Sequence, residues 1–134
     1  MTRTGMLTAG QIAFDTEVPG SSQAIIALFS EATEDPNPIH VDAAFALKSG
    51  FPQVIQQGPM TTAHFARLLA AAFGAARLRV LDVSFTAPVF PLDALRYKAV
   101  AGHATEGRVR IELTAQKADG TVTARGYAEV EAAE

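Results

Sequence analysis

A carboxylate, an amide and an imidazole lie close together in the first third of the chain. They belong to Asp35, Asn37 and His40, with Pro36 and Pro38 between them. Because proline restricts both its own backbone and that of the residue before it, Asp35 and Asn37 are kept out of a helix. A carboxylate and an imidazole held in this way can share one water or substrate proton, as general acid–base catalysis requires. The segment is therefore a candidate catalytic site.

The same segment also fits a purely structural interpretation. The sequence Asp-Pro-Asn-Pro is common in turns, and Asp42 is a natural N-cap for a short helix expected over residues 43–47. Ser49 and Gly50 would end that helix. The spacing alone leaves both the catalytic and the structural interpretation open.

The composition is that of one globular domain. At 134 residues, with 49% hydrophobic and 19% charged residues, the chain fits a single domain that spans residues 1–134. A formal net charge of −3 argues against a nucleic-acid surface, and no segment approaches the run of about 18 apolar residues that a membrane helix needs. The absence of cysteine excludes disulfides, thiolate nucleophiles and cysteine metal ligands. We expect a soluble, cytoplasmic protein, since the N-terminal residues also lack the apolar region of a signal peptide.

Two longer helices flank the candidate site in the sequence. The first begins at Ser21 or Ser22, either of which can cap it. One face of this helix, expected to pack against the protein, carries apolar residues at helical spacing: Ile25, Leu28, Phe29 and Ala32. The second helix spans residues 58–73 and is apolar around most of its circumference, which is typical of a buried helix. Pro59 just inside its start and Gly74 just past its end match the usual asymmetry of helix termini.

In the C-terminal part of the chain, apolar residues alternate with polar ones, which predicts β-strands with one apolar face. The alternating residues are Leu81, Val83 and Phe85; Leu95, Tyr97 and Ala99; Val109, Ile111, Leu113 and Ala115; and Val122, Ala124, Gly126, Ala128 and Val130. Turns at Glu106-Gly107 and at Asp119-Gly120 separate the last three runs and indicate an antiparallel meander. A weaker pattern over residues 6–18 predicts an edge strand.

One buried helix and one antiparallel sheet with a single apolar face predict an α+β fold in which the sheet wraps around the helix. So few strands cannot enclose a helix completely, and an edge strand and part of the helix therefore need cover. A second copy of the subunit supplies that cover most simply, so we expect a dimer.

Three motifs resemble those of one known family. Residues 35–46 resemble a hydratase signature, an Asp-x-Asn-Pro-x-His core that runs into a short helix. Residues 54–58 lead into the long helix as the family's glycine segment does, and residues 84–89 resemble its Phe-x-x-Pro-Val strand end. On these motifs the chain resembles the MaoC-like branch of the hot-dog fold, the family of (R)-specific enoyl-CoA hydratases and related 3-hydroxyacyl-thioester dehydratases.

The resemblance implies a hydro-lyase that interconverts a trans-2-enoyl thioester and its (R)-3-hydroxyacyl thioester, with CoA or an acyl-carrier protein as the carrier. It assigns Asp35 and His40 as the catalytic pair and Asn37 as the amide that orients them. It assigns Gly58 as the residue whose backbone N–H polarises the thioester carbonyl, a role that suits a helix N-terminus. From the residues themselves we expect no cofactor, no metal, and a homodimer or higher oligomer, with a heterodimer possible.

The chain departs from the family pattern at the start of the long helix. Many members have a histidine before the glycine and an apolar residue after it, where this chain has Gln57 and Pro59. Because Pro59 has no N–H, Gly58 and Met60 are the remaining backbone donors near the helix start.

Two other functions remain open. One is a non-catalytic or partner subunit of a heteromeric acyl-thioester dehydratase, although such subunits normally lack the Asp and His that this chain retains. The other is a hot-dog acyl-CoA thioesterase, which the Asn-Pro-x-His core disfavours. Release of free CoA from an acyl-CoA would distinguish the thioesterase at once.

A few other polar residues have both a structural and a functional interpretation. We expect His64, on the long helix, to be a partly buried structural residue, the alternative being a role in lining the acyl pocket or the dimer interface, and we expect His103 to be solvated. No metal or nucleotide site is expected, because neither His-x-x-x-His spacing nor a glycine-rich phosphate loop is present. Four arginines on the expected strands or next to them could contact the phosphates of a CoA or carrier-protein arm, or simply face solvent: Arg77, Arg79, Arg108 and Arg110.

Overall fold

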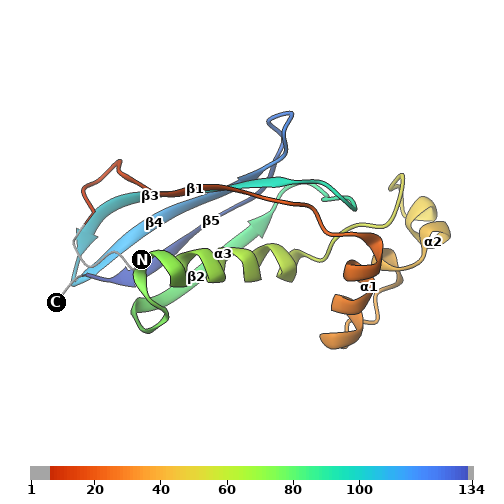
Figure 1. Cartoon of the computed structure of the whole chain (residues 1–134), viewed down its shortest axis with the longest axis horizontal. Helices are drawn as coiled ribbons and strands as arrows, with labels where there is room; N and C mark the ends of the chain where they lie inside the picture. The colour runs from red at the N-terminus through yellow and green to blue at the C-terminus, as the bar shows by residue number, and fades with distance from the viewer. Residues whose placement is uncertain (1–6, 133–134) are drawn as a thin grey trace.

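The computed structural model of the protein describes residues 7–132 and shows a curved antiparallel sheet with a long helix running along it (Figure 1). Within this range the sheet has five strands in the order β1-β3-β4-β5-β2, which confirms the predicted α+β arrangement. The strands are β1 (Ile12–Val18), β2 (Leu78–Phe85), β3 (Leu95–Thr105), β4 (Arg108–Gln116) and β5 (Val122–Glu131). The helices are α1 (Gln23–Ala32), α2 (Ala43–Lys48) and α3 (Gly58–Phe73), with short 3-10 turns η1 (Pro38–His40) and η2 (Ala75–Arg77).

The last three strands form the predicted meander. Glu106 and Gly107 both have positive φ, at 54° and 79°, which is the backbone of a tight hairpin turn between β3 and β4. Gly120, with φ of 90°, turns the chain from β4 into β5. Strand β1 pairs with β3 alone and lies at one edge of the sheet, as the sequence predicts.

The hydrophobic core lies between α3 and the inner face of the sheet. Phe65 and Leu69 of α3 are fully buried, as are Ile111 of β4 and the ring of Tyr97 on β3. The rings of Phe65 and Tyr97 meet edge to face, with their centroids 4.9 Å apart. Burial of α3 is what fixes the position of its N-terminus, where Gly58 lies.

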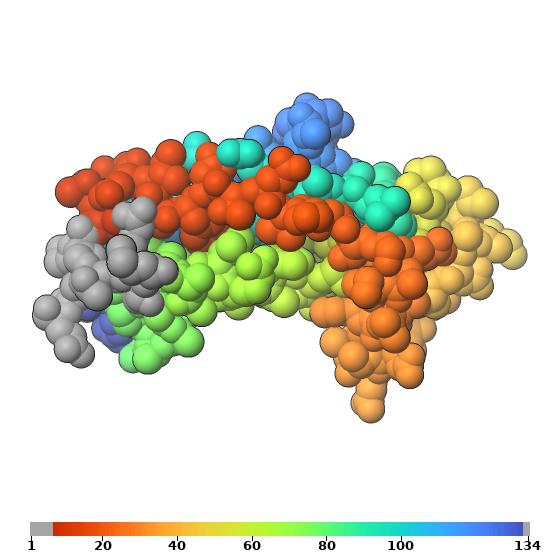
Figure 2. Space-filling model, in the orientation of Figure 1, coloured from red at the N-terminus to blue at the C-terminus, as the bar shows by residue number. Residues whose placement is uncertain are grey.

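Helices α1 and α2 and the turn η1, residues 23–48, form a helical arm that lies beyond the end of the sheet (Figure 1). Figure 2 shows α1 projecting from the body of the molecule. The predicted start of α1 is confirmed, because the Ser22 hydroxyl oxygen accepts a hydrogen bond from the Ile25 N–H at 3.2 Å. The predicted cap of α2 is confirmed as well, because the Asp42 carboxylate accepts the Phe45 N–H at 3.1 Å.

The predicted packing face of α1 is wrong. Ile26 and Ser30 are the buried residues of the helix, whereas Ile25 is 49% exposed and Leu28 is 58% exposed. The reason lies in the position of the helix, because α1 packs at the end of the molecule and touches Gln57 through Ile26 and Ser30. The apolar stripe read from the sequence therefore faces solvent in a single subunit.

The prediction of one dry face on every strand is wrong at the end of β2. Leu81 and Val83 are partly buried against the core, but Phe85 is 51% exposed. Strand β2 is the second edge of the sheet, and the ring of its last residue lies against Gly58, the first residue of α3. Among residues 7–132, no helix is long and apolar enough to cross a membrane.

Candidate functional site

The structure brings the carboxylate of Asp35 and the imidazole of His40 together. Asp35 lies in the loop after α1, and His40 ends the 3-10 turn η1. The Nε2 atom of His40 and the Oδ2 atom of Asp35 are 3.5 Å apart, with the His40 side chain 10% exposed and the Asp35 side chain 30% exposed. This separation exceeds that of an ordinary charge-assisted hydrogen bond, so neither atom is fully engaged by the other.

The hydrogen bond on the far side of the His40 ring fixes its tautomer. The Nδ1 atom lies 2.7 Å from the backbone carbonyl oxygen of Ile55. A carbonyl oxygen can only accept, so Nδ1 must carry the hydrogen, and in the neutral ring Nε2 presents its lone pair toward Asp35. His40 is thus held in the orientation and tautomer that general acid–base chemistry at Nε2 requires.

The loop that carries the pair uses ordinary turn chemistry. The Asp35 Oδ1 atom accepts the Asn37 N–H at 3.0 Å, and the Asn37 Oδ1 atom accepts the Ile39 N–H at 3.1 Å. The Asp35 N–H in turn donates to the Ser30 carbonyl oxygen at 2.9 Å. The structural interpretation of this motif is therefore correct, and it also positions the pair. Asn37 shapes the turn, and its Oδ1 atom contacts the Ile39 backbone rather than the His40 ring.

A cavity of about 320 Å³ opens beside His40 at the N-terminal end of α3. Gly58 lies in its wall together with His40, so the structure brings these two sequence-predicted residues to one space. Asp35 is not part of that wall and lies instead in a shallow depression with Ser30 and Glu31. The other residues of the wall are mostly apolar: Phe51, Ile55, Gln56, Gln57, Thr61, Phe85, Ala87, Pro88, Val89 and Thr123.

Gly58 begins α3, where the first backbone N–H groups have no partner within the helix. The predicted second donor, Met60, is wrong, because its N–H donates to the Gln57 carbonyl oxygen at 3.1 Å. Pro59 has no N–H, so Gly58 supplies the donor of this turn. A Cβ atom at position 58 would lie 2.6 Å from the Cε2 atom of Phe85, so the exposed Phe85 ring packs directly over this glycine.

Gln57 is a functional candidate, although from the sequence it stands out only as a departure from the family pattern. Its side chain is 1% exposed, and its Nε2 atom donates to the Ile26 carbonyl oxygen at 2.8 Å and to the Ser30 hydroxyl at 2.7 Å. These bonds join α1 to the start of α3. The Oε1 atom is buried without a hydrogen-bond partner among the described residues. The signal in the sequence was the polar residue in place of the family's histidine.

His64 does not line the cavity that contains His40. It is half-buried on α3, and its Nδ1 atom lies 3.2 Å from the Nη2 atom of Arg67. Burial, with a smaller contribution from the Arg67 guanidinium, lowers the pKa of His64 below its ordinary value. His64 is thus the partly buried residue that was expected, and His103 is exposed as expected. Among residues 7–132 no cluster of metal-ligating side chains is found.

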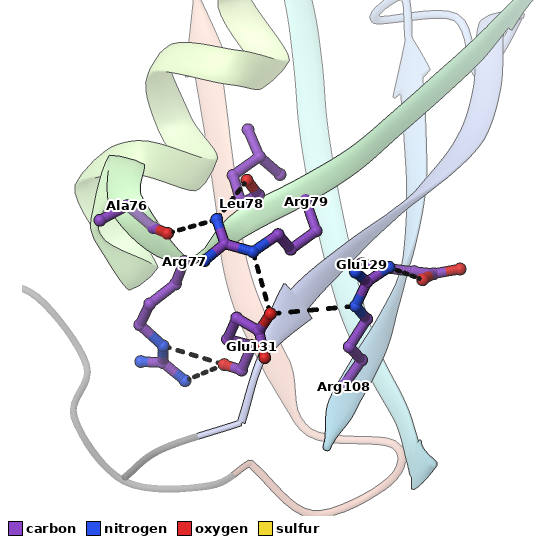
Figure 3. Close-up of polar contacts among 7 residues, drawn as sticks. All are labelled: Ala76, Arg77, Leu78, Arg79, Arg108, Glu129 and Glu131. Atoms are coloured by element: carbon purple, nitrogen blue, oxygen red, sulfur yellow. Dashed lines mark hydrogen bonds and ion pairs between the residues drawn. The ribbon is translucent and has the colours of Figure 1, made fainter. Parts of the chain in front are cut away.

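Three of the four arginines considered for phosphate binding, Arg77, Arg79 and Arg108, gather at the other end of α3 and face glutamate oxygens (Figure 3). Arg77 donates from Nε and Nη2 to the Glu131 carbonyl oxygen, at 2.9 and 2.7 Å. Arg79 bonds the Glu131 carboxylate at 2.9 Å, and Arg108 bonds Glu129 at 3.1 Å. These pairs favour a stabilising role over a phosphate-binding one.

Arg110 follows the same pattern on the outer face of β4. Its Nε atom bonds the Glu112 carboxylate at 2.8 Å, and its guanidinium lies over the ring of Tyr127, 3.9 Å from the centroid. Both contacts hold the side chain against the sheet.

Comparison with known proteins gives consistent results. The family model described as MaoC like domain matches residues 5–123. A fatty acid synthase beta subunit from Aspergillus oryzae is 34% identical over 110 residues, which is 78% of this chain and 5% of that protein. The mitochondrial 3-hydroxyacyl-[acyl-carrier-protein] dehydratase of Arabidopsis thaliana is 29% identical over 90 residues, which is 67% of this chain and 53% of that protein.

The fold is shared with solved structures. The R-hydratase PhaJ1 from Pseudomonas aeruginosa in its unliganded form superposes with a TM-score of 0.80 at 26% identity, covering 96% of this chain and 83% of that one. This likeness confirms the predicted hot-dog fold. The chain nevertheless spans only 5% of the fatty acid synthase subunit and about half of the plant dehydratase, so the activities of those whole proteins do not transfer by similarity alone.

Proposed function

Because the chain belongs to the MaoC-like domain family of hydratases and dehydratases, we propose that it adds water to a trans-2-enoyl thioester and removes it from the (R)-3-hydroxyacyl thioester. The observation that carries the proposal is the Asp35–His40 pair, 3.5 Å apart, with His40 and Gly58 in the wall of one largely apolar cavity. The whole chain, residues 1–134, would act as one catalytic domain.

Gly58 would stabilise the charge that develops during the reaction. Attack of water on the enoyl thioester places enolate-like negative charge on the carbonyl oxygen. The N-terminal end of α3 offers the Gly58 N–H and the positive end of the helix dipole at that point. A side chain at this position would meet the Phe85 ring, which would have to shift.

Asp35 and His40 would move the protons. In hydration the oxygen of water forms a bond to C3, one group of the pair takes a proton from that water, and the other group gives a proton to C2. Dehydration reverses these steps. The buried Nδ1–Ile55 hydrogen bond keeps Nε2 of His40 free for its part in the transfer.

The subunit would act as a homodimer or higher oligomer, or with a related second subunit. Within residues 7–132, no further strand pairs with the outer edges of β1 and β2. The exposed Ile25 and Leu28 of α1 add an apolar face that a second subunit could cover. The carrier would be CoA or an acyl-carrier protein.

The test is a panel of trans-2-enoyl-CoAs of increasing chain length. We expect the absorbance of the conjugated enoyl thioester to fall without release of free thiol, and the product to resist an (S)-specific 3-hydroxyacyl-CoA dehydrogenase. Free CoA release would indicate a thioesterase instead. Activity that appears only after addition of a second hot-dog subunit would favour the partner-subunit alternative.

A further inference from the structure

Gln57 carries a buried hydrogen-bond acceptor that has no partner among residues 7–132. The residue is 1% exposed and is one of those that line the cavity containing His40 and Gly58. Its Oε1 atom has no hydrogen-bond partner among the described residues. Buried polar atoms are nearly always paired, so an unpaired one beside a candidate site calls for a donor that enters from the cavity.

The orientation of the Gln57 amide follows from its partners. The Ile26 carbonyl oxygen can only accept, so the atom 2.8 Å from it must be the amide nitrogen. That nitrogen also contacts the Ser30 hydroxyl at 2.7 Å, which uses the second amide hydrogen. With the amide turned the other way, the Gln57 Oε1 atom would face the Ile26 carbonyl oxygen, and both are acceptors. The oxygen is therefore the atom left without a partner.

Neighbouring hydroxyl groups in the cavity wall do not supply the missing hydrogen. Thr123 donates its hydroxyl to the Ala115 carbonyl oxygen at 3.3 Å. The Thr61 hydroxyl does not donate to this oxygen either, since Oε1 has no hydrogen-bond partner among the described residues. The donor for Gln57 must then come from solvent or from a bound ligand.

The proposed reaction has a hydrogen that needs such an acceptor. Water brings two hydrogens to the site, and the pair can take only one of them, because its other member must hold the proton destined for C2. The second hydrogen stays on the oxygen and becomes the hydrogen of the 3-hydroxyl group. A neutral amide oxygen can accept a hydrogen bond from it and cannot remove the proton.

We propose that Gln57 Oε1 accepts a hydrogen bond from the 3-hydroxyl group of the hydroxyacyl thioester, and from the same oxygen in the water that is added. This inference rests on the proposed hydratase function for its choice of ligand. It gives Gln57 two separate tasks. The amide nitrogen joins α1 to α3, and the amide oxygen orients the water so that its lone pair faces C3.

The test compares two ligands that differ only in the hydroxyl group, hexanoyl-CoA and (R)-3-hydroxyhexanoyl-CoA. Because the wild-type protein would dehydrate the hydroxyl ligand, calorimetry uses the Asp35→Asn/His40→Ala background, where that ligand should bind more tightly than hexanoyl-CoA by roughly threefold to tenfold, the range for one neutral hydrogen bond. Adding Gln57→Leu to this background should remove the preference, so that the two ligands bind with equal affinity. An equal loss for both ligands, or an unchanged preference, would overturn the inference.

Ser30→Ala is the matched control, since it removes one partner of the amide nitrogen and leaves the amide oxygen in place. It should keep the preference for the hydroxyl ligand, and loss of the preference would mean that the junction between α1 and α3 is the cause. Hydration by the wild-type protein is measured separately with trans-2-hexenoyl-CoA. If the protein hydrates trans-2-hexenoyl-CoA but the preference for the hydroxyl ligand does not depend on Gln57, only this inference is contradicted. If the preference depends on Gln57 but no hydration is seen, the proposed reaction is contradicted and the binding role of Gln57 is supported.

Discussion

Ionisable side chains lie near both ends of α3, but the pairs at the two ends are arranged differently. At the C-terminal end, Arg79 and Glu131 form an ion pair at 2.9 Å with side chains 43% and 39% exposed. At the N-terminal end, Asp35 and His40 stay 3.5 Å apart, and His40 is nearly buried. Exposed pairs satisfy each other and add little stability. Groups that are held close but not fully bonded keep hydrogen-bonding capacity for a ligand.

The strongest test of this comparison removes the pair at the N-terminal end. Asp35→Asn and His40→Ala should each lower kcat for enoyl-CoA hydration by about two to four orders of magnitude, because each removes a proton-transfer group. The unfolding temperature and the affinity for the thioester should change little. Steady-state kinetics with a thermal melt of each variant gives the answer, and near-normal hydration by either variant would remove the proposed mechanism.

The second test concerns the backbone donor at the start of α3. Gly58→Val should lower kcat by roughly a hundredfold or more, the effect of losing one oxyanion donor, because its side chain must displace the Phe85 ring and then obstructs the N–H. Pro59→Met is the matched control and should retain activity, since Pro59 contributes no donor. An active Gly58→Val enzyme would show that the carbonyl oxygen is held elsewhere.

A smaller effect is expected at Asn37. Its side-chain oxygen accepts the Ile39 N–H and so shapes the turn, and it does not contact the His40 ring. Asn37→Ala should lower kcat about tenfold to a hundredfold, and stability by about 1 kcal/mol, through loss of the cap on Ile39. Asn37→Asp keeps an acceptor for the Ile39 N–H and should recover most of both losses. If Asn37→Asp is as inactive as Asn37→Ala, the amide nitrogen must contact the substrate.

The smallest effect is expected at the paired end. Arg79→Ala should change the free energy of unfolding by less than about 1 kcal/mol and leave both kcat and KM for an enoyl-CoA within about twofold of wild type. Urea unfolding and kinetics measure the two quantities. A tenfold rise in KM would break the comparison, because it would show that the arginine end takes part in binding the carrier phosphates.

The local elements were predictable because their signals are local. Ser22, Asp42 and Gly74 mark helix ends by chemistry that acts within one turn, and the structure places all three at those ends. Alternation defined the strands in the same way. The proline-rich motif also predicted that Asp35 and His40 would meet, since only four residues separate them in the sequence.

The errors arose where a residue's environment depends on distant parts of the chain. Ile25 and Leu28 are apolar, but α1 packs at the end of the molecule through Ile26 and Ser30 instead. Phe85 continues an apolar alternation, yet its ring lies against Gly58 at the start of α3 and is half exposed. No pattern around Gln57 shows that its amide spans two helices, because both partners of its nitrogen lie about thirty residues earlier in the sequence.

Because the helical arm lies beyond the sheet, it should unfold more readily than the rest of the protein. The arm is joined to the body by a few hydrogen bonds, among them those of Gln57 to α1 and that of the Ile55 N–H to the Ile39 carbonyl oxygen at 3.2 Å. The strands of the meander, by contrast, are paired along nearly their whole length. Amide hydrogens of η1 and α2 should therefore exchange with solvent through local opening, at a lower free energy than those of β3 to β5. The site would behave as a separate cooperative unit, able to unfold and reform on a sheet that stays intact.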